Sequence, residues 1–298
     1  MLEQKVMSFH EIVNDESEPP PPIIDDGVLL DRSLLLVVGQ PKANKSFLAL
    51  NMGVAIASGT DFAGFSVVDN HRVLFLSAEG GYYSNRERIK TITADIEEED
   101  LQEIFFSTKV VPDLGNDSDD NIFKACIEEY KPKVLILDPF IRFHTADENS
   151  SSSMSNIFAK IRKLIDEHDI AVILVHHEGK NASKGGRGSS VIHAEYDSCI
   201  TLEKKNSKHL FKFDMRHVET PEPKELIFNT DTFWFEDPYK SSPIVDYISQ
   251  NDLSLKKDIV SYLKTTLPCS PAQAYRIIDS AVSEGTIVKD GKKYKLSS

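Results

Sequence analysis

Residues 39–46, Gly39-Gln-Pro-Lys-Ala-Asn-Lys45-Ser46, decide how this chain is expected to fold. They follow five consecutive apolar residues, 34–38, and precede a stretch, 47–58, with the composition of a helix. A glycine, a lysine and a serine at this spacing between a strand and a helix match the phosphate-binding loop pattern G-x-x-x-x-G-K-[ST]. The pattern predicts a nucleotide site at the start of the helix.

The loop departs from this pattern at one position, where Asn44 replaces the second glycine. Such loops turn backbone N–H groups inward, which can require a positive φ, and Asn adopts positive φ more readily than most residues. We therefore expect binding to be preserved. Lys45 would then reach the β- and γ-phosphates of ATP, Ser46 would ligate Mg²⁺, and the helix N-terminus would attract the anion. The alternative is an ordinary helix start without a ligand.

Short apolar runs alternate with helical patterns after this loop. Uninterrupted apolar runs are typical of parallel strands buried on both faces, and strands alternating with helices give a doubly wound sheet. We therefore predict an α/β fold with a mainly parallel sheet. The predicted strands are residues 34–38, 73–76, 134–137 and 171–175, and the predicted helices are residues 45–58, 84–96, 119–130 and 154–167.

Changes in composition predict three segments along the chain. Residues 1–26 hold seven acidic side chains and one lysine and are expected to be flexible. Within them, residues 16–22 end in four consecutive prolines and should form an extended, solvated lead-in. Residues 27–238 would form the α/β domain, with short antiparallel strands between residues 195 and 235 at the sheet edge. Residues 241–298 hold three helical patterns and a hairpin signal at Asp290-Gly291, the arrangement of a winged helix-turn-helix domain.

Two carboxylates follow predicted strands and are candidates for the chemistry. Asp138 ends the strand 134–137, where an acid can hold the metal's water shell, although many parallel strands end in Asp without a ligand. Glu79 follows the strand 73–76 and emerges at the same carboxyl edge, where it could act as the general base for the attacking water. The alternative role for Glu79 is capping the helix that starts near Ser84.

His176 and His177 end the predicted strand 171–175. Adjacent strand residues point to opposite faces, so the pair is poorly suited to hold one zinc ion. We interpret one histidine as a sensor of the γ-phosphate or of the attacking water, and the other as a packed residue. The glycine-rich loop that follows carries Lys180, Lys184 and Arg187, and could grip nucleic acid, reach a neighbour's γ-phosphate, or be a solvated surface loop.

The order of these motifs resembles the RecA-like ATPases typified by plasmid replicative helicases of the RepA type. The resemblance covers roughly residues 27–236. It is carried by the phosphate loop and by four later stretches, Arg72-Val-Leu-Phe-Leu-Ser-Ala-Glu-Gly80, Leu135-Ile-Leu-Asp-Pro139, Val175-His-His177 and Arg187-Gly-Ser-Ser190. Those relatives form ring-shaped hexamers with ATP at subunit interfaces and single-stranded DNA in the pore.

The resemblance implies a role for each matching residue. Glu79 would be the catalytic glutamate, His177 or His176 the sensor, and Arg187 an arginine finger acting on a neighbouring subunit. Arg216 is a second candidate arginine, although the lysine that usually accompanies it is replaced in Asp214-Met-Arg216. The implied nucleotide-binding residues are Gly39, Gln40, Pro41, Lys42, Ala43, Asn44, Lys45, Ser46, Phe47, Asp138 and Arg216, with Ser46 and Asp138 also serving Mg²⁺.

The predicted wing of the C-terminal domain is the most basic part of the chain. It carries Lys289, Lys292, Lys293 and Lys295, which could sit on DNA phosphates, whereas the predicted recognition helix 271–283 is less basic. Many winged helices bind proteins instead, so both partners stay open. We assign single-stranded DNA contacts to Lys180, Lys184, Lys292 and Lys293.

Composition limits the class of protein. The 298 residues are 40% hydrophobic and 27% charged, typical of a soluble globular chain, and no apolar run is long enough to span a membrane. The formal charge of −13 argues against a nucleic-acid partner on average, but residues 241–298 are net positive. Cys126, Cys199 and Cys269 are isolated, which argues against disulfides and structural zinc and favours a cytoplasmic protein.

Together these features predict an ATP-hydrolysing oligomeric motor, a helicase acting on single-stranded DNA during replication. One alternative is a recombinase-like or regulatory ATPase, in which nucleotide state controls assembly and the C-terminal domain recruits partners. Another is a scaffold that binds nucleotide without hydrolysing it, which the substitution at Asn44 makes conceivable. Stimulation of hydrolysis by single-stranded DNA distinguishes a motor from an adaptor.

Overall fold

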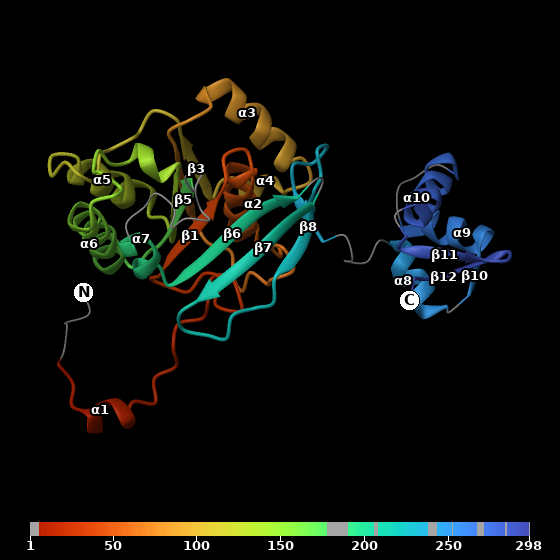
Figure 1. The fold of residues 1–298 in the computed structure, drawn as a ribbon, viewed down its shortest axis with the longest axis horizontal. Coiled ribbons are helices and arrows are strands. Elements are labelled where there is room, and N and C mark those ends of the chain that lie inside the picture. Colours follow the sequence, from red (N-terminus) through yellow and green to blue (C-terminus); the bar gives the residue numbers. More distant parts are fainter. Residues whose placement is uncertain are drawn as a thin grey trace. The chain divides into compact units, whose positions relative to one another are not determined.

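The computed structural model describes residues 6–177, 190–205, 208–237, 243–251, 253–266, 271–283 and 285–297. The chain divides into two compact units, Met1–Glu236 and Asp237–Ser298 (Figure 1). Each unit has a hydrophobic core of its own. Because the described helices include none that is both long and apolar enough to cross a membrane, no spanning segment is assigned.

The first unit is built on a sheet whose described strands follow the order β3-β2-β4-β5-β1-β6-β7-β8-β9. The first six strands in this order are parallel to one another. Strands β7, β8 and β9 each run antiparallel to the strand before them in the sheet. The strands are β1 (Leu34–Gly39), β2 (Val73–Ser77), β3 (Ile104–Ser107), β4 (Val134–Asp138), β5 (Ala171–His177), β6 (Ser198–Lys205), β7 (Lys208–Met215), β8 (Lys224–Phe228) and β9 (Phe235–Glu236).

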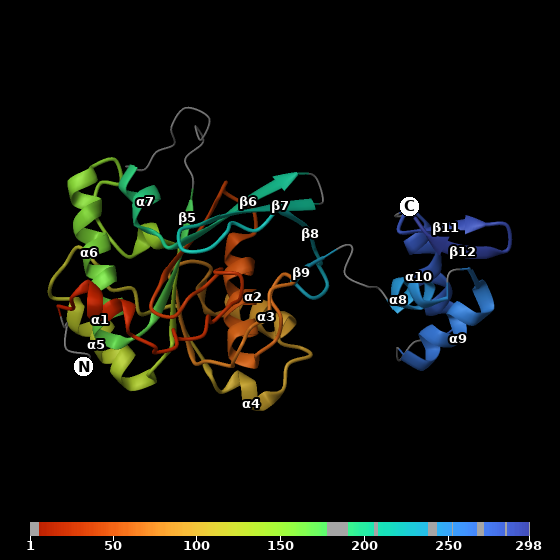
Figure 2. The same ribbon diagram turned by 90° about the horizontal axis from the view of Figure 1, so that it is seen from below.

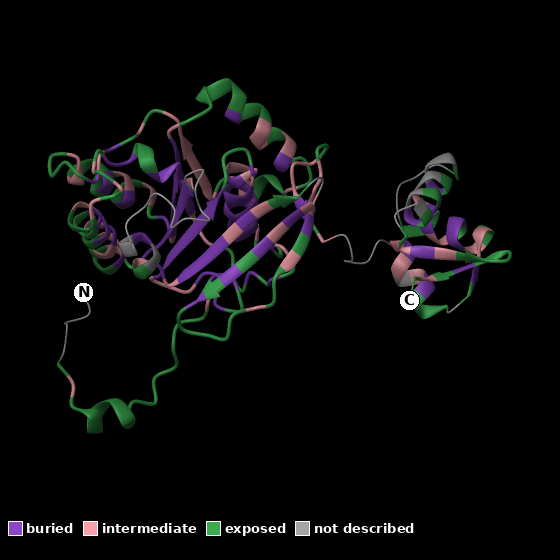
Figure 3. Cartoon of the chain, in the orientation of Figure 1, coloured by how far each residue is buried: buried purple, intermediate pink, exposed green. Residues whose placement is uncertain are grey.

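Helices cover both faces of this sheet (Figure 2). Side chains of alternate strand residues enter two separate cores, so Leu35 and Val37 of β1 pack with α2, whereas Leu34 and Leu36 pack with α5 and α6. The central strands are therefore buried along their length (Figure 3). The helices are α2 (Lys45–Ser58), α3 (Gly81–Ile92), α4 (Glu98–Leu101), α5 (Asp120–Tyr130), η1 (Phe140–Arg142), α6 (Ser151–His168) and α7 (Ser190–Glu195).

The predicted α/β fold with a mainly parallel sheet is confirmed, with two corrections. Strand β6 is parallel to β1, so only the strands after it are antiparallel, whereas every strand between residues 195 and 235 was expected to be. The helix expected at residues 84–96 begins at Gly81 and ends at Ile92. Its N-cap, Gly80, has a φ of 85°, a conformation that glycine adopts without steric cost.

The acidic N-terminal segment contains a short helix before the extended stretch expected at residues 16–22. This helix is α1 (Phe9–Val13), in which Ser8 and Glu11 form a capping box. Packing of the first unit also starts before residue 27, because Ile23 and Ile24 are buried in its core and Ile24 bridges to Leu29 and Val67. Ile23 and Ile24, which follow the prolines, therefore pack with the first unit although they lie before the expected boundary at residue 27.

The second unit has three described helices, α8 (Pro243–Gln250), α9 (Lys256–Thr266) and α10 (Pro271–Ser283). They pack with a small antiparallel sheet of order β10-β12-β11, where β10 is Ser254–Leu255, β11 is Ile287–Asp290 and β12 is Lys293–Leu296. Asp290 pairs with Lys293, and Gly291 turns the chain with a φ of 62°. The core is small and aliphatic, with Ile244, Ile259 and Leu263 fully buried.

Candidate functional site

The loop between β1 and α2 has the backbone shape that a phosphate cradle needs. Asn44 lies in the left-handed region, with φ 66° and ψ 26°, as its substitution for glycine led us to expect. Gly39 is required for a different reason. A Cβ atom at Gly39 would lie 2.4 Å from the carbonyl oxygen of Leu202, because β6 passes directly beside β1 at this point. The loop is therefore fixed by its neighbouring strand as well as by its own conformation.

Lys45, in the first turn of α2, is folded back into this loop. Its side chain is almost fully buried, and Nζ donates to the carbonyl oxygens of Gly39 at 2.7 Å and Gln40 at 2.9 Å. The ammonium group thus occupies the mouth of the cradle, beside the N-terminus of α2. A helix N-terminus and a buried ammonium together favour an anionic ligand here.

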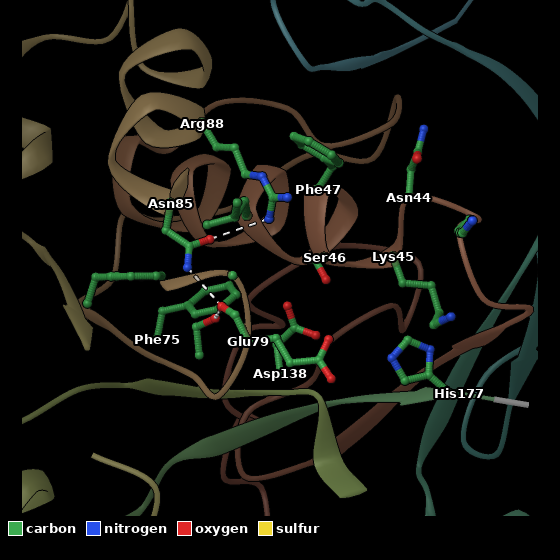
Figure 4. A pocket seen from close by; sticks show the side chains of 15 residues that line it. Asn44, Lys45, Ser46, Phe47, Phe75, Glu79, Asn85, Arg88, Asp138 and His177 are labelled. Carbon is green, nitrogen blue, oxygen red and sulfur yellow. Dashed lines mark hydrogen bonds between the residues drawn. The ribbon is translucent and has the colours of Figure 1, made fainter. Parts of the chain in front are cut away.

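A cavity of about 330 Å³ opens in front of the loop (Figure 4). It is lined by residues of the loop and of the start of α2, by the ends of β2, β4 and β5, and by the helix α3 that follows β2. Segments far apart in the chain therefore converge on one site at the carboxyl edge of the sheet. The residues selected from the sequence that meet there are Lys42, Asn44, Lys45, Ser46, Phe47, Glu79, Asp138 and His177.

Asp138, the last residue of β4, lies at the floor of the cavity. It is 4% exposed, and its Oδ1 atom has no hydrogen-bond partner among the described residues. Burial raises the pKa of this carboxyl to about 6; the nearby hydroxyl of Ser46 opposes the shift, and the charge of Glu79 adds to it. The site therefore holds a carboxylate that is costly to ionise without a cation.

The raised pKa has a consequence for stability. Because the folded carboxyl of Asp138 binds its proton more tightly than the unfolded one, stability is lost as the pH rises from about 4 through about 6. We expect Asp138→Asn to raise the free energy of unfolding at pH 8 by up to about 3 kcal/mol, and to have little effect near pH 4. Urea unfolding at both pH values measures this.

The matched control for that experiment is Asp166→Asn, an exposed aspartate on α6. Its effect should be within about 0.5 kcal/mol at both pH values, as for most exposed substitutions. An Asp138→Asn protein that is less stable than the wild type at pH 8, or equally affected at both pH values, would show that ionisation of Asp138 does not weaken the fold.

Glu79 stands on the turn between β2 and α3, at the rim of the cavity. Its carbonyl oxygen accepts hydrogen bonds from Ser77 Oγ at 3.0 Å and from Asn85 Nδ2 at 2.9 Å, so the backbone that presents the carboxylate is held on both sides. The carboxylate itself is about half exposed and lies 3.8 Å from the Nε atom of Arg142. The side chain of Glu79 can therefore rotate while its backbone stays in place.

The two histidines at the end of β5 point to opposite faces of the sheet, as expected for adjacent strand residues. His177 faces the cavity, and its Nδ1 atom is buried without a hydrogen-bond partner among the described residues. Burial and the nearby charge of Lys45 lower its pKa, against a smaller opposing effect of Glu79, which favours the neutral ring. His176 is buried on the opposite face of the sheet. Of the pair, His177 can contact a ligand in the cavity.

Sequence reasoning missed two cavity residues on α3. Asn85 is buried, and its Oδ1 atom accepts a 3.5 Å hydrogen bond from Arg88 Nη1. The guanidinium of Arg88 lies 5.1 Å from the ring centre of Phe47, and its charge acts on Asp138. The signal was available: Gly81, Asn85 and Arg88 share one helix face, four and three residues apart. Arg88 therefore supplies positive charge to the cavity from the same chain.

The remaining candidates do not meet in this cavity. Arg216 follows the end of β7, which runs antiparallel and so finishes at the opposite edge of the sheet, where its backbone N–H donates to Asp197. Arg216 is therefore not part of the nucleotide cavity of its own chain, and a role at a neighbour's nucleotide stays a prediction. Lys180, Lys184 and Arg187 lie outside the described residues. Lys292 and Lys293 are exposed at the β11–β12 turn of the second unit.

The donors at the floor of the cavity suit a hard cation. Ser46 supplies a hydroxyl to the cavity and Asp138 a carboxylate, and oxygen donors of this kind are those that Mg²⁺ accepts. Nowhere in the described ranges do three His, Cys, Asp or Glu side chains converge to hold an ion. Ser46 and Asp138 fit a magnesium ion, whose remaining ligands would come from phosphate and water, as is common in nucleotide sites.

Comparison with known proteins identifies both a family and a fold. The family model described as an AAA domain matches residues 3–183. Among the solved structures that are similar in fold is an ATPase domain with a TM-score of 0.56 at 14% identity, where the match covers 76% of this chain and 95% of that one. The RadB recombinase has a TM-score of 0.50 at 16% identity, covering 70% and 91%.

A further similar structure is that of a DnaB-like replicative helicase and its interactions with primase. Its TM-score is 0.54 at 15% identity, and the match covers 69% of this chain and 57% of the helicase chain. At these identities the likeness is one of fold, and the fold it supports is RecA-like, consistent with the mostly parallel sheet and the position of the phosphate loop.

Proposed function

The chain belongs to the AAA domain family, and from that premise we propose that it is an ATPase that works as an oligomeric motor on single-stranded DNA. The observation that carries the proposal is the convergence of Lys45, Asp138, Glu79 and His177 on one cavity at the N-terminus of α2. Those four groups are a cation for phosphate, an acid for the metal, a base for water and a polar sensor.

In this proposal each residue has one task. The N–H groups of the loop and of α2 bind the phosphates, and Lys45 exchanges its carbonyl partners for phosphate oxygens. Ser46 and Asp138 would hold Mg²⁺, which would supply positive charge for the transferred phosphoryl group. Glu79 takes the proton of the attacking water, and its half-exposed carboxylate can turn inward for this. His177 donates or accepts one hydrogen bond, through which it distinguishes ATP from ADP.

We further propose that the hydrolytic site is completed by a second copy of the chain. Arg88 already places a guanidinium in the cavity from the same chain, next to Phe47. Arg187 and Arg216 are then the candidates for the neighbour's contribution, since Arg216 stands at the sheet edge opposite to its own phosphate loop. This arrangement calls for a head-to-tail assembly, which closes into a ring such as a hexamer.

The C-terminal unit is proposed to be a winged helix that contacts DNA. Its three helices and the β11–β12 hairpin have the required order, and the hairpin presents exposed Lys289, Lys292 and Lys293. Asp279 on α10 pairs with Lys256 at 3.0 Å, and this lysine offsets one negative charge of the proposed recognition helix. A protein partner for this unit is the alternative.

The first test is stimulation. We expect single-stranded DNA to raise the ATPase rate of the full chain several-fold, and nucleotide to increase the oligomer mass. The substitutions Lys292→Ala and Lys293→Ala together should lower DNA affinity and reduce the salt dependence of binding, because two phosphate contacts are lost. Steady-state hydrolysis and light scattering make these measurements, with exposed Lys124→Ala on α5 as the control.

The outcomes separate the candidate functions. ATP hydrolysis that ignores single-stranded DNA, together with assembly that follows nucleotide state, would favour a regulatory or recombinase-like ATPase. The RecA-like fold is compatible with that function as well. Stimulated hydrolysis without displacement of a strand from a forked duplex would remove the helicase assignment and leave a DNA-dependent ATPase.

A further inference from the structure

The last residues of β5 join two different environments. His177 enters the cavity, and His176 points to the opposite face, where it meets Glu148 and His144 from the loop between η1 and α6. The side chains of His144, Glu148 and His176 are 0%, 20% and 6% exposed. Two buried imidazoles and a partly buried carboxylate thus lie together, and His176 is the chain neighbour of the proposed sensor.

Glu148 lies between the two imidazoles. Its Oε1 atom is 3.5 Å from His176 Nδ1 and 3.9 Å from His144 Nε2. Both separations exceed the usual N–H···O length of about 2.9–3.0 Å, and neither Glu148 Oε1 nor His144 Nε2 has a hydrogen bond within the described part of the chain. A buried carboxylate in this state is costly, and a small approach of either ring would satisfy it.

The loop that presents Glu148 is well anchored. Its start is fixed by Phe143, which is fully buried and accepts a 2.7 Å hydrogen bond from the backbone of Leu114. Its end is fixed by Asp147, whose carbonyl accepts from Ser150 at 2.9 Å at the N-cap of α6. Phe140 packs against both rings of the cluster, with centroids 4.6 Å and 6.4 Å away.

The end of β5, in contrast, is held on one side only by backbone pairing. Pairing with β1 continues to His177, opposite Gly39, but pairing with β4 stops at Leu174. On one face of the sheet, the side chain of His176 links this strand end to the loop before α6. A contact that fixes His176 also fixes the peptide that carries His177.

We propose that Glu148, supported by His144, is a positioning residue that acts through His176 to set the place of His177 in the nucleotide cavity. This deepens the proposed function, on which it rests for its kinetic readout. Binding of a γ-phosphate by His177 shifts the end of β5, His176 closes on Glu148, and the carboxylate accepts a hydrogen bond from the ring. The sensor and the loop before α6 then respond as one unit.

The charges around the cluster determine its response to pH. Burial raises the pKa of Glu148, and the neighbouring charge of Asp147 adds to this. Burial lowers the pKa of His144, which the backbone at Ala146 and the charge of Asp113 oppose. The carboxylate that holds His176 is therefore lost as the pH falls through a pKa above the ordinary value of Glu, and hydrolysis should decline with it.

The first experiment needs no nucleotide. Correlation spectra of the histidine rings of the full chain, recorded across a pH series, report the tautomer and pKa of each ring. We expect Glu148→Gln to shift the ring signals and titration of both His176 and His177, whereas Glu167→Gln, a control on the exposed face of α6, should shift neither. His177 signals that do not change in Glu148→Gln would overturn the proposal, even if ATP is hydrolysed.

The second experiment measures coupling. In the wild type, Mg²⁺ with a non-hydrolysable ATP analogue should change the His144 signals across the sheet, and Glu148→Leu should abolish that change. We expect kcat of Glu148→Leu to fall about tenfold with KM for ATP within about twofold, because a misplaced group costs rate more than binding. Glu148→Gln should keep part of the wild-type kcat. Its hydrolysis rate should also fall less steeply as the pH is lowered.

These outcomes keep the two proposals apart. Parallel loss of kcat, nucleotide binding and folded protein in both Glu148 variants would indicate a purely structural residue and overturn the positioning role. A wild type that takes up no nucleotide would overturn the proposed function, and the nucleotide-free spectra would still decide whether Glu148 positions His177.

Discussion

Glu79→Gln is expected to lower kcat for ATP hydrolysis by about 10²–10⁴-fold, the range that a positioned general base contributes. Its carbonyl is fixed by Ser77 and Asn85, so the amide should occupy the same place as the carboxylate. Affinity for ATP should therefore change by less than about threefold, since the lost group acts mainly in the transition state. Single-turnover hydrolysis and nucleotide titration of the same preparation measure the two quantities.

The control for this experiment is Glu87→Gln on α3, where the glutamate pairs with Arg86 at the surface. It should keep the wild-type rate. A Glu79→Gln protein that hydrolyses ATP within about threefold of the wild type would show that another group activates the water. If it assembles and functions unchanged, the chain is a nucleotide-dependent scaffold.

The second large effect concerns binding. Lys45→Ala should weaken affinity for ATP with Mg²⁺ by about 10²-fold, which corresponds to about 2.7 kcal/mol. The loss is large because the ammonium is buried and its charge is little screened by solvent. Titration calorimetry against ATP and against adenosine separates the phosphate contribution, since adenosine should be unaffected.

Lys124→Ala, at an exposed position of α5 where the lysine pairs with Glu128, serves as the matched control and should bind ATP normally. The empty loop loses two hydrogen bonds in Lys45→Ala, so the folded fraction must be measured alongside. Undiminished ATP uptake by folded Lys45→Ala would mean that the cavity in front of α2 is not the nucleotide site, and the roles assigned to Asp138 and His177 would be withdrawn with it.

Local patterns were sufficient for the centre of the fold. The apolar runs that became β1, β4 and β5 are buried on both faces, so their composition is fixed by packing and is readable without a structure. The phosphate loop was readable for the same reason, because its backbone shape restricts which residues can occupy the positions of Asn44 and Gly39.

The edge strand of the sheet and the contacts between distant segments could not be predicted from local sequence patterns. Strand β3 was missed, since it is half-buried and follows the acidic stretch around α4. The place of Arg216 depends on the direction of β7, which no local pattern encodes. The cluster of His144, Glu148 and His176 joins two segments with the whole of α6 between them, and its members are ordinary polar residues in sequence.

The resting position of Lys45 has a consequence for which anions the loop accepts. Two backbone carbonyl groups already accept hydrogen bonds from the ammonium group of Lys45, so an incoming anion must compete with them. We therefore expect sulfate or inorganic phosphate to bind more weakly than a polyphosphate chain, which would also contact the loop amides and the helix terminus. The backbone of the loop would in this way set a threshold for the entry of small anions.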